Sequence, residues 1–285
     1  MYLDYFIFPD ADKEFDFLLS IKRTCYSSYY PFQILSARGF ERIDFEPVTI
    51  LYGGNGSGKT TALNVIAEKT GVKRDSIYNR SSFFPDYVDL SYMGLADRDI
   101  PANSRIISSD DVFDYMLNIR NLNEGIDLKR QELFDEYLDA KYSDFQLKSM
   151  ADYDQLKKIN KARRKTQSRF VKSELMDNVR GFSNGESAYK YFTEKIGEDG
   201  LYLLDEPENS LSPKRQLELK AFIEDSARFF GCQFVISTHS PFLLSIPGAK
   251  IYDLDEDPVD IKRWTQLENV RIYYEFFKSH LDDFE

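Results

Sequence analysis

Eight consecutive residues carry the clearest chemistry in this sequence. They read Gly53-Gly54-Asn55-Gly56-Ser57-Gly58-Lys59-Thr60 and match the pattern G-x-x-x-x-G-K-[ST]. Glycines let successive backbone N–H groups turn inward around phosphates, and a helix start adds the positive end of its dipole. We expect Lys59 to reach the β- and γ-phosphates of a nucleotide and the Thr60 hydroxyl to ligate Mg²⁺. The pattern therefore predicts a nucleotide-binding loop rather than a glycine-rich turn that binds nothing.

An acidic pair follows a short apolar run later in the chain. Asp205 and Glu206 come directly after Leu201–Leu204. Because such a run is typical of a buried strand, we expect both carboxylates at the end of a sheet. Asp205 would hold the Mg²⁺ shell, directly or through water, and Glu206 would orient and polarise an attacking water. The alternative is a strand that simply ends in solvent, and the loop in the same chain disfavours it.

Two further candidate elements flank the acidic pair. Ser183 and Gly185 lie in the run Phe-Ser-Asn-Gly-Glu, and Ser183 precedes Asp205 by 22 residues. A helix that starts there would offer a second anion site. His239 follows an apolar run 34 residues after Asp205. A lone histidine is more often structural than catalytic, but this one is expected at a strand end, where α/β sheets place ligands.

The elements that must position these residues alternate between strands and helices. This alternation favours an α/β fold with a mainly parallel sheet. Residues 111–180 are rich in Leu, Glu, Lys and Arg and lack proline, so we read them as an inserted helical subdomain. The expected strands are Phe32–Ala37, Arg42–Phe45, Val48–Tyr52, Val88–Ser91, Arg105–Ser108, Leu201–Leu204 and Gln233–Ser237, and the expected helices are Thr60–Lys69, Val112–Asn118, Gly185–Ile196 and Gln216–Phe230.

Composition sets the outer limits of the interpretation. The 285 residues are 42% hydrophobic and 30% charged, as in folded globular proteins. We expect one domain over 1–285, with 254–285 as a C-terminal extension. Two cysteines, Cys25 and Cys232, form no disulfide framework or metal-ligand spacing, and no apolar stretch reaches the ~18 residues of a membrane span. We therefore expect a protein of the reducing cytoplasm.

Taken in this order and spacing, the four elements resemble those of an ABC-type ATPase, which has the P-loop NTPase fold. The family signature resembles Leu-Ser-Gly-Gly-Gln, and here it reads Phe182–Glu186. The segment Pro207–Pro213 resembles the D-loop of that family. The sequence of this segment, together with the acidic pair, is similar to that of soluble AAA-type ATPases allied to the heads of DNA-repair and chromosome-maintenance proteins. The resemblance spans roughly residues 32–253.

The resemblance implies a role for each candidate residue. Gly53 to Thr61 would bind ATP, Thr60 and Asp205 would hold Mg²⁺, and Glu206 would be the catalytic base. His239 resembles the switch histidine that senses the γ-phosphate. Ser183 and Gly185 resemble the pair that caps the γ-phosphate of the opposite subunit, so the resemblance also implies an ATP-dependent homodimer.

Three departures from the family pattern affect this interpretation. Asn184 replaces a glycine of the signature, Ser212 stands where many members have Asp, and no glutamine occurs between Lys59 and Gln131, where the family has its Q-loop. Asp110 would either substitute for that glutamine or cap a helix. The adenine contact is also open, because Arg38 or Arg42 would either stack on the base or be surface charges.

A basic stretch suggests a route to a partner. Residues 157–172 contain eight Lys or Arg and no acid, in a chain whose net charge is −11. They are either a solvated helical face or a contact for nucleic acid, for nucleotide phosphates across the dimer, or for an acidic effector protein.

Three functions remain open at this point. The leading one is an ATP-driven dimeric switch, with DNA maintenance or defence as candidate settings. The alternatives are the ATP-binding subunit of a membrane transporter and a non-hydrolysing ATP sensor that gates a partner protein. The intact Asp205-Glu206 pair argues against the sensor, and the atypical D-loop and missing Q-loop glutamine argue against the transporter subunit.

Overall fold

The chain divides into two compact units. The computed structural model describes residues 1–22, 25–26, 28–144, 153–175 and 184–284. We call Met1–Phe113 with Asn184–Glu285 the sheet unit, and Asp114–Ser183 the helical unit. Two predictions about domain organisation stay proposals: that residues 111–180 are an inserted subdomain, and that residues 254–285 are a C-terminal extension.

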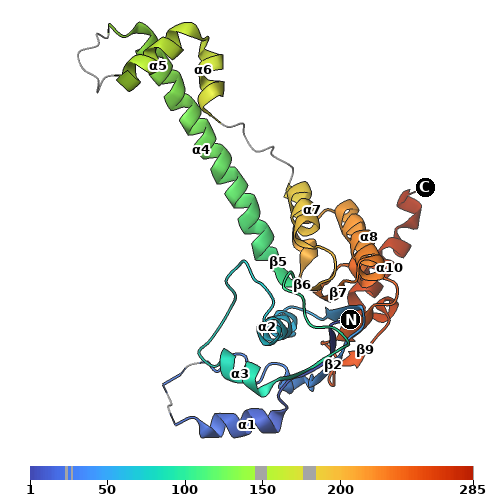
Figure 1. Cartoon of the computed structure of the whole chain (residues 1–285). Helices are drawn as coiled ribbons and strands as arrows, with labels where there is room; N and C mark the ends of the chain where they lie inside the picture. The colour runs from blue at the N-terminus through green and yellow to red at the C-terminus, as the bar shows by residue number, and fades with distance from the viewer. Residues whose placement is uncertain (23–24, 27, 145–152, 176–183, 285) are drawn as a thin grey trace. The chain divides into compact units, whose positions relative to one another are not determined.

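A six-stranded sheet forms the centre of the sheet unit (Figure 1). Its first five strands are parallel, and the last pairs antiparallel to its neighbour. The central strands are almost wholly buried apolar runs, as expected where helices cover both faces of a parallel sheet. The fold is thus the predicted α/β class with a mainly parallel sheet. The strand order is β5 (Arg105–Ser108), β6 (Leu201–Asp205), β7 (Gln233–Ser237), β3 (Val48–Tyr52), β8 (Lys250–Asp253) and β9 (Asp260–Ile261).

A second, antiparallel sheet lies against this core. Its strands are ordered β2 (Arg42–Asp44), β1 (Leu3–Ile7) and β4 (Tyr92–Leu95). The buried Gln233 side chain at the start of β7 connects the two sheets, because its Oε1 accepts from the backbone N–H groups of Tyr2 and Leu3 at 2.8 and 2.9 Å. This bond satisfies backbone donors that would otherwise be buried without a partner.

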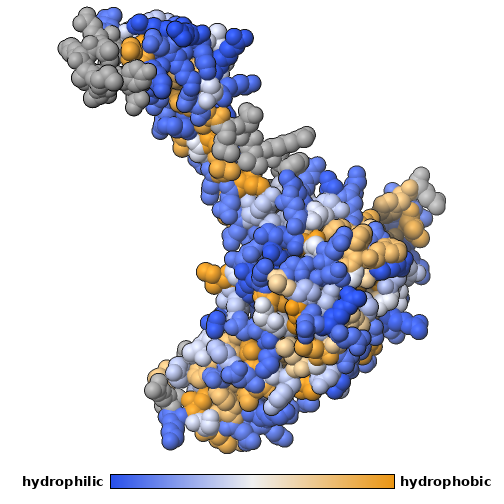
Figure 2. Space-filling model, viewed as in Figure 1, coloured by the Kyte–Doolittle hydropathy of each residue, from blue (hydrophilic) through white to orange (hydrophobic). Residues whose placement is uncertain are grey.

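Helices complete the sheet unit. The helix that follows the nucleotide-binding loop is buried along most of its length, which fixes the loop against the sheet. The α-helices are α1 (Ala11–Ser20), α2 (Lys59–Thr70), α3 (Phe84–Leu90), α7 (Asn184–Lys195), α8 (Pro213–Phe229), α9 (Pro241–Leu244) and α10 (Glu268–Ser279). Short 3-10 turns are η1 (Ser36–Arg38), η3 (Pro207–Ser210), η4 (Trp264–Gln266) and η5 (Leu281–Phe284). Figure 2 shows hydrophobic surface near the C-terminal end, where α10 and η5 expose several aromatic side chains.

Two of the expected strands are wrong. Residues 32–35 form turns that lead into η1, which takes up Ser36 and Ala37, and Phe32 and Leu35 are buried in the core without strand pairing. Residues 88–90 complete α3, which has Pro85 in its first turn, a favoured helix-start position. β1 and α1 were not predicted, because residues 1–33 show only weak periodicity. The helix expected over Val112–Asn118 is the start of the much longer α4 (Ser109–Tyr142), and the other expected strands and helices are present within a few residues of their predicted bounds.

The helical unit is built on a small core of its own. α4 (Ser109–Tyr142) supplies Leu133 and Tyr137, α5 (Tyr153–Arg164) supplies Ile159, and α6 (Gln167–Glu174) supplies Phe170 and Val171. The described part of 111–180 is thus helical, as predicted. In the part of the chain that the structure describes, no helix has the length and apolar character needed to cross a membrane.

Candidate nucleotide-binding site

Glycines shape the loop between β3 and α2. Gly53, Gly56 and Gly58 have φ angles of 152°, 80° and 98°, which L side chains rarely adopt. A Cβ at Gly58 would lie 2.8 Å from Cδ2 of Leu35, and one at Gly53 would lie 2.7 Å from Oγ of Ser57. Both backbone conformation and close packing therefore require glycine at these two positions.

Lys59 is the cation held inside this loop. Its side chain is 4% exposed, and Nζ donates to the carbonyl oxygens of Gly53 and Gly54 at 2.7 and 3.0 Å. Burial lowers the pKa of Lys59, while the nearby Glu206 carboxylate opposes that change. The Gly54 N–H donates to Oδ2 of Asp255 at 2.6 Å, a contact that sequence reasoning missed. The loop is thus held closed around a buried positive charge.

Thr60 and Asp205 meet where the loop faces the end of β6. The Thr60 hydroxyl donates to Oδ1 of Asp205 at 3.1 Å, and the Ser237 hydroxyl donates to the same oxygen. Burial raises the pKa of Asp205. A carboxylate and a hydroxyl side by side are the oxygen ligands that Mg²⁺ prefers. Ser237 was not among the predicted residues, and it comes here because it pairs with Asp205 across β6 and β7.

Glu206 projects from a strained position beside the loop. Its φ is 48°, in the left-handed region, and its N–H donates to the Ser237 carbonyl at 3.0 Å. The carboxylate lies 3.6 Å from Nε2 of His239, accepts from Nδ2 of Asn209 at 2.9 Å and lies 3.9 Å from Nζ of Lys59. His239, then Asn209 and Lys59, lower the pKa of Glu206 to about 2. Glu206 is therefore ionised at neutral pH, and its strained backbone is of the kind that clusters at active sites.

Glu208 positions the segment that carries His239. Its Oε1 accepts from the backbone N–H groups of His239 and Ser240 at 2.6 and 3.2 Å. Glu208 belongs to η3, so this contact connects the residues after Glu206 to the residues after β7. The family pattern had marked Glu208 only as part of the D-loop. The sequence feature that could have pointed to Glu208 is the presence of an acidic residue two positions after Glu206.

The predicted second anion site is described only in part. Ser183 lies outside the described residues. Gly185 lies in the first turn of α7, where a Cβ would be 3.7 Å from the Ser210 carbonyl oxygen and 3.9 Å from the Ser212 N. The start of α7 thus packs against the Pro207–Pro213 segment, and its part in binding a nucleotide stays a prediction.

The helix-cap alternative for Asp110 is wrong. Asp110 lies exposed in the first turn of α4, and Asp111 makes the capping contacts. Oδ2 of Asp111 accepts from the Ser108 N–H at 2.6 Å, and the Ser108 hydroxyl faces the Asp111 N–H at 3.3 Å. This reciprocal pair is a capping box, which satisfies donors at the helix start.

The remaining candidates have local partners. Arg38 donates to the Leu254 carbonyl at 2.8 Å. Arg42 pairs with Asp44 at 2.6 Å, and its guanidinium lies 4.7 Å from the centre of the Tyr5 ring. The role of either arginine toward adenine stays open.

The residues present fit a magnesium nucleotide. Nε2 of His239 and Oγ of Ser57 are buried and form no hydrogen bond within the described residues, although Nε2 lies 3.6 Å from the Glu206 carboxylate. Such unpartnered polar atoms are uncommon, and a phosphate oxygen would supply the missing partner for a donating Nε2. The Thr60–Asp205 oxygen pair offers the cation site beside them.

Comparison with known proteins identifies the family. The chain has an α/β fold with a phosphate loop and an acidic strand end, which defines a P-loop ATPase. The family model described as "ABC transporter" matches residues 42–209, more than half of the chain, and the chain therefore belongs to the ABC-type P-loop ATPases. A second model, described as "AAA domain, putative AbiEii toxin, Type IV TA system", matches residues 178–245. No curated protein matches the chain significantly.

Solved structures of similar proteins include two SMC head domains and a bacterial ABC transporter cassette. The Smc head domain of Pyrococcus furiosus, bound to the C-terminal domain of ScpA, is 14% identical with a TM-score of 0.40 and covers 82% of this chain and 94% of its own. The SMC head domain of Thermotoga maritima is 13% identical with a TM-score of 0.36, and the match covers 78% of this chain and 92% of that domain. The dimeric bacterial ABC transporter cassette MJ0796 is 13% identical with a TM-score of 0.38, and the match covers 78% of this chain and 88% of the cassette. The family assignment rests on the family model.

Proposed function

We propose that this chain hydrolyses ATP to ADP and phosphate with Mg²⁺. One observation carries the proposal: Lys59, Thr60, Asp205, Glu206 and His239 converge at the carboxyl ends of three adjacent parallel strands. Parallel α/β sheets bind their ligands at this edge. Membership of the ABC-type ATPases supports the same activity.

We assign each residue a step. Lys59 and the loop N–H groups bind the β- and γ-phosphates, and Thr60 and Asp205 hold Mg²⁺, which when bound draws charge from the phosphate oxygens. Glu206, ionised because its pKa is about 2, accepts a hydrogen bond from the attacking water and polarises it. His239 donates from Nε2 to a γ-phosphate oxygen. Glu208 keeps the His239 backbone in place.

We further propose that two chains enclose the nucleotides between them. The residues described above bind the γ-phosphate from one side, and Ser183 and Gly185 of a second copy would close the other side. ATP binding would then assemble the dimer and hydrolysis would release it, which makes a switch that acts on DNA or on an effector protein. We place this switch in the cytoplasm, because Cys25 and Cys232 are unpaired thiols.

Phosphate release by the purified chain tests this function. Wild-type protein should release phosphate with ATP and Mg²⁺, and the rate per subunit should rise with protein concentration because the active form is a dimer. Ser183→Arg should bind ATP normally but release no phosphate, since a bulky side chain blocks the opposite nucleotide. Full turnover by Ser183→Arg would leave a single-subunit ATPase, and no turnover by wild type would remove the hydrolytic function.

A further inference from the structure

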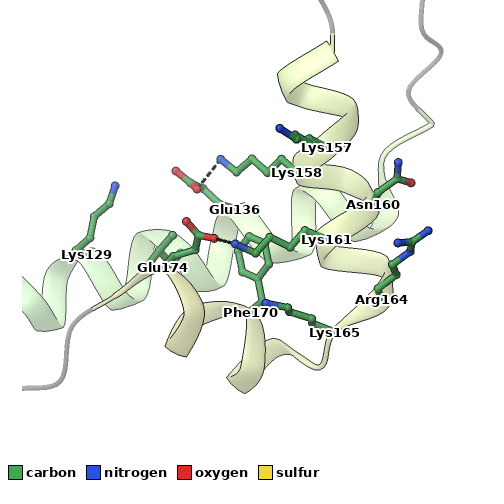
Figure 3. A pocket seen from close by; sticks show the side chains of 11 residues that line it. Lys129, Glu136, Lys157, Lys158, Asn160, Lys161, Arg164, Lys165, Phe170 and Glu174 are labelled. Atoms are coloured by element: carbon green, nitrogen blue, oxygen red, sulfur yellow. Dashed lines mark hydrogen bonds and ion pairs between the residues drawn. The ribbon is translucent and has the colours of Figure 1, made fainter.

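The helical unit contains a cavity between α4, α5 and α6. The cavity has a volume of about 880 Å³ and lies among α4, α5 and α6 (Figure 3). Leu133 and Phe170, both almost fully buried, form its apolar floor. Six cationic side chains line it: Lys129, Lys157, Lys158, Lys161, Arg164 and Lys165. This site is separate from the nucleotide-binding residues, none of which lines it.

The cavity is positive although the chain as a whole is acidic. Against the six cations, Glu136 and Glu174 are the two acids in the lining, so the lining has a net charge of +4. The chain as a whole has a net charge of −11. Charges separated by more than ~8 Å are largely screened at physiological salt, so the local charge decides what the cavity attracts.

Ion pairs brace the walls of the cavity and involve only some of its cations. Lys158 pairs with Glu136 at 2.6 Å, which connects α5 to α4, and Lys161 pairs with Glu174, which connects α5 to α6 (Figure 3). Lys129 pairs with Glu132 at 2.8 Å along α4, and within the described residues Arg164 and Lys165 form no ion pair. The acids are thus used to hold the helices together, and a binding partner would find cations not neutralised by a neighbour.

The chemistry of the lining favours linked phosphates. Five of the six cations are lysines, whose compact charges bind phosphates as point charges without a fixed bidentate geometry. Phe170, the aromatic residue of the lining, is 1% exposed and offers no face for a base. The cavity volume lies within the ~300–1,000 Å³ range of ligand sites and greatly exceeds a single phosphate.

We propose that this cavity binds the phosphate backbone of a nucleic acid without preference for base sequence. Contacts to phosphates position a protein on nucleic acid and carry no sequence information. Five of the six lining cations belong to the basic stretch 157–172, so the cavity names the residues through which that stretch would contact nucleic acid. It acts independently of the ATPase chemistry.

The test measures binding of fluorescein-labelled DNA of mixed sequence, single-stranded and duplex, to the full chain without ATP. Arg164→Glu with Lys165→Glu changes the cavity lining. Arg169→Glu with Lys172→Glu is the matched control, because it makes the same change of charge in the same basic stretch at residues that do not line the cavity. If circular dichroism shows that a Glu variant does not fold, both pairs of residues are replaced by Gln instead of Glu.

At about 50 mM salt, we expect the DNA affinity of the cavity variant to be about 10-fold or more below that of wild type, and the affinity of the control to be less than about 3-fold below it. The reason is that each lost phosphate contact removes ~0.7–0.9 from the slope of log affinity against log salt. Inorganic polyphosphate should compete with the DNA and poly-glutamate should not. Absent binding by wild type, equal losses in both variants, or equal competition by poly-glutamate would each overturn the proposal.

Discussion

Replacement of Lys59 by methionine separates nucleotide binding from folding. Lys59 Nζ is buried and donates to the carbonyl oxygens of Gly53 and Gly54 at 2.7 and 3.0 Å. Methionine keeps the length of the side chain and removes its charge. The change therefore tests the role of the ammonium group with little alteration of packing.

The expected loss of ATP affinity follows from two charge-assisted hydrogen bonds. In our account, Nζ donates to the β- and γ-phosphates, and each hydrogen bond to a charged group contributes about 1.5–3 kcal/mol. Loss of both costs about 3–6 kcal/mol, which corresponds to a rise in Kd of roughly 10²–10⁴-fold.

The same change should leave the protein without ATP nearly as stable as wild type. Burial lowers the pKa of Lys59, which means that its charged form costs free energy in the fold. Removal of that cost offsets the two lost hydrogen bonds to carbonyl groups, so we expect the unfolding temperature to stay within about 3 °C.

Thermal unfolding with and without ATP measures both effects. With ATP at 100 times the wild-type Kd, wild type gains about 2.7 kcal/mol of stability. Lys59→Met, with a Kd raised at least 100-fold, gains about 0.4 kcal/mol or less. An ATP-dependent stabilisation equal to that of wild type would refute the assignment of the phosphate loop.

Three further predictions concern the same site. Glu208→Ala should lower kcat about 10- to 100-fold while ATP affinity changes less than about 3-fold, because His239 loses its backbone anchor and moves from the phosphate; equal losses in affinity and kcat would contradict this. The pKa of Glu206 is lowered to about 2, so its stabilising ionisation is present above its ordinary value of 4.5 and is lost as pH falls toward 2. His239→Ala should move that pKa back toward 4.5, which carbon-13 NMR of the Glu206 carboxyl can follow; an unchanged titration would exclude His239 as the cause. Gly58→Ala should destabilise the fold by about 1–3 kcal/mol in urea unfolding, because its φ is 98° and a Cβ would press on a neighbouring leucine, and wild-type stability in this variant would contradict the loop geometry.

The parts of the fold that the sequence predicts are those with strong local signals. Val48–Tyr52 and Leu201–Leu204 are continuous apolar runs, as required of strands buried on both faces of a parallel sheet. Phe32–Ala37 has similar apolar content but packs into the core as a turn, and local composition does not distinguish the two cases. In α3, the helix start at Pro85 outweighs the strand preference of residues 88–91.

The candidate site divides in the same way. Lys59, Thr60 and Asp205 belong to contiguous motifs and were predicted. Ser237 and Asp255 join them through the pairing of β6 with β7 and of β3 with β8, and that pairing is not encoded in any short segment. Long-range register therefore sets the limit of what the sequence alone predicts about this site.

The most direct test of the account is the mass of Glu206→Gln in solution with ATP and Mg²⁺. Glutamine keeps the shape of the side chain and can still accept from Asn209, but it lacks the carboxylate that polarises water. The variant should bind ATP, fail to hydrolyse it and accumulate as a dimer. Light scattering should then give a mass twice that of the 33.3 kDa monomer, and a variant that stays at 33.3 kDa with saturating ATP would contradict the nucleotide-sandwiched dimer.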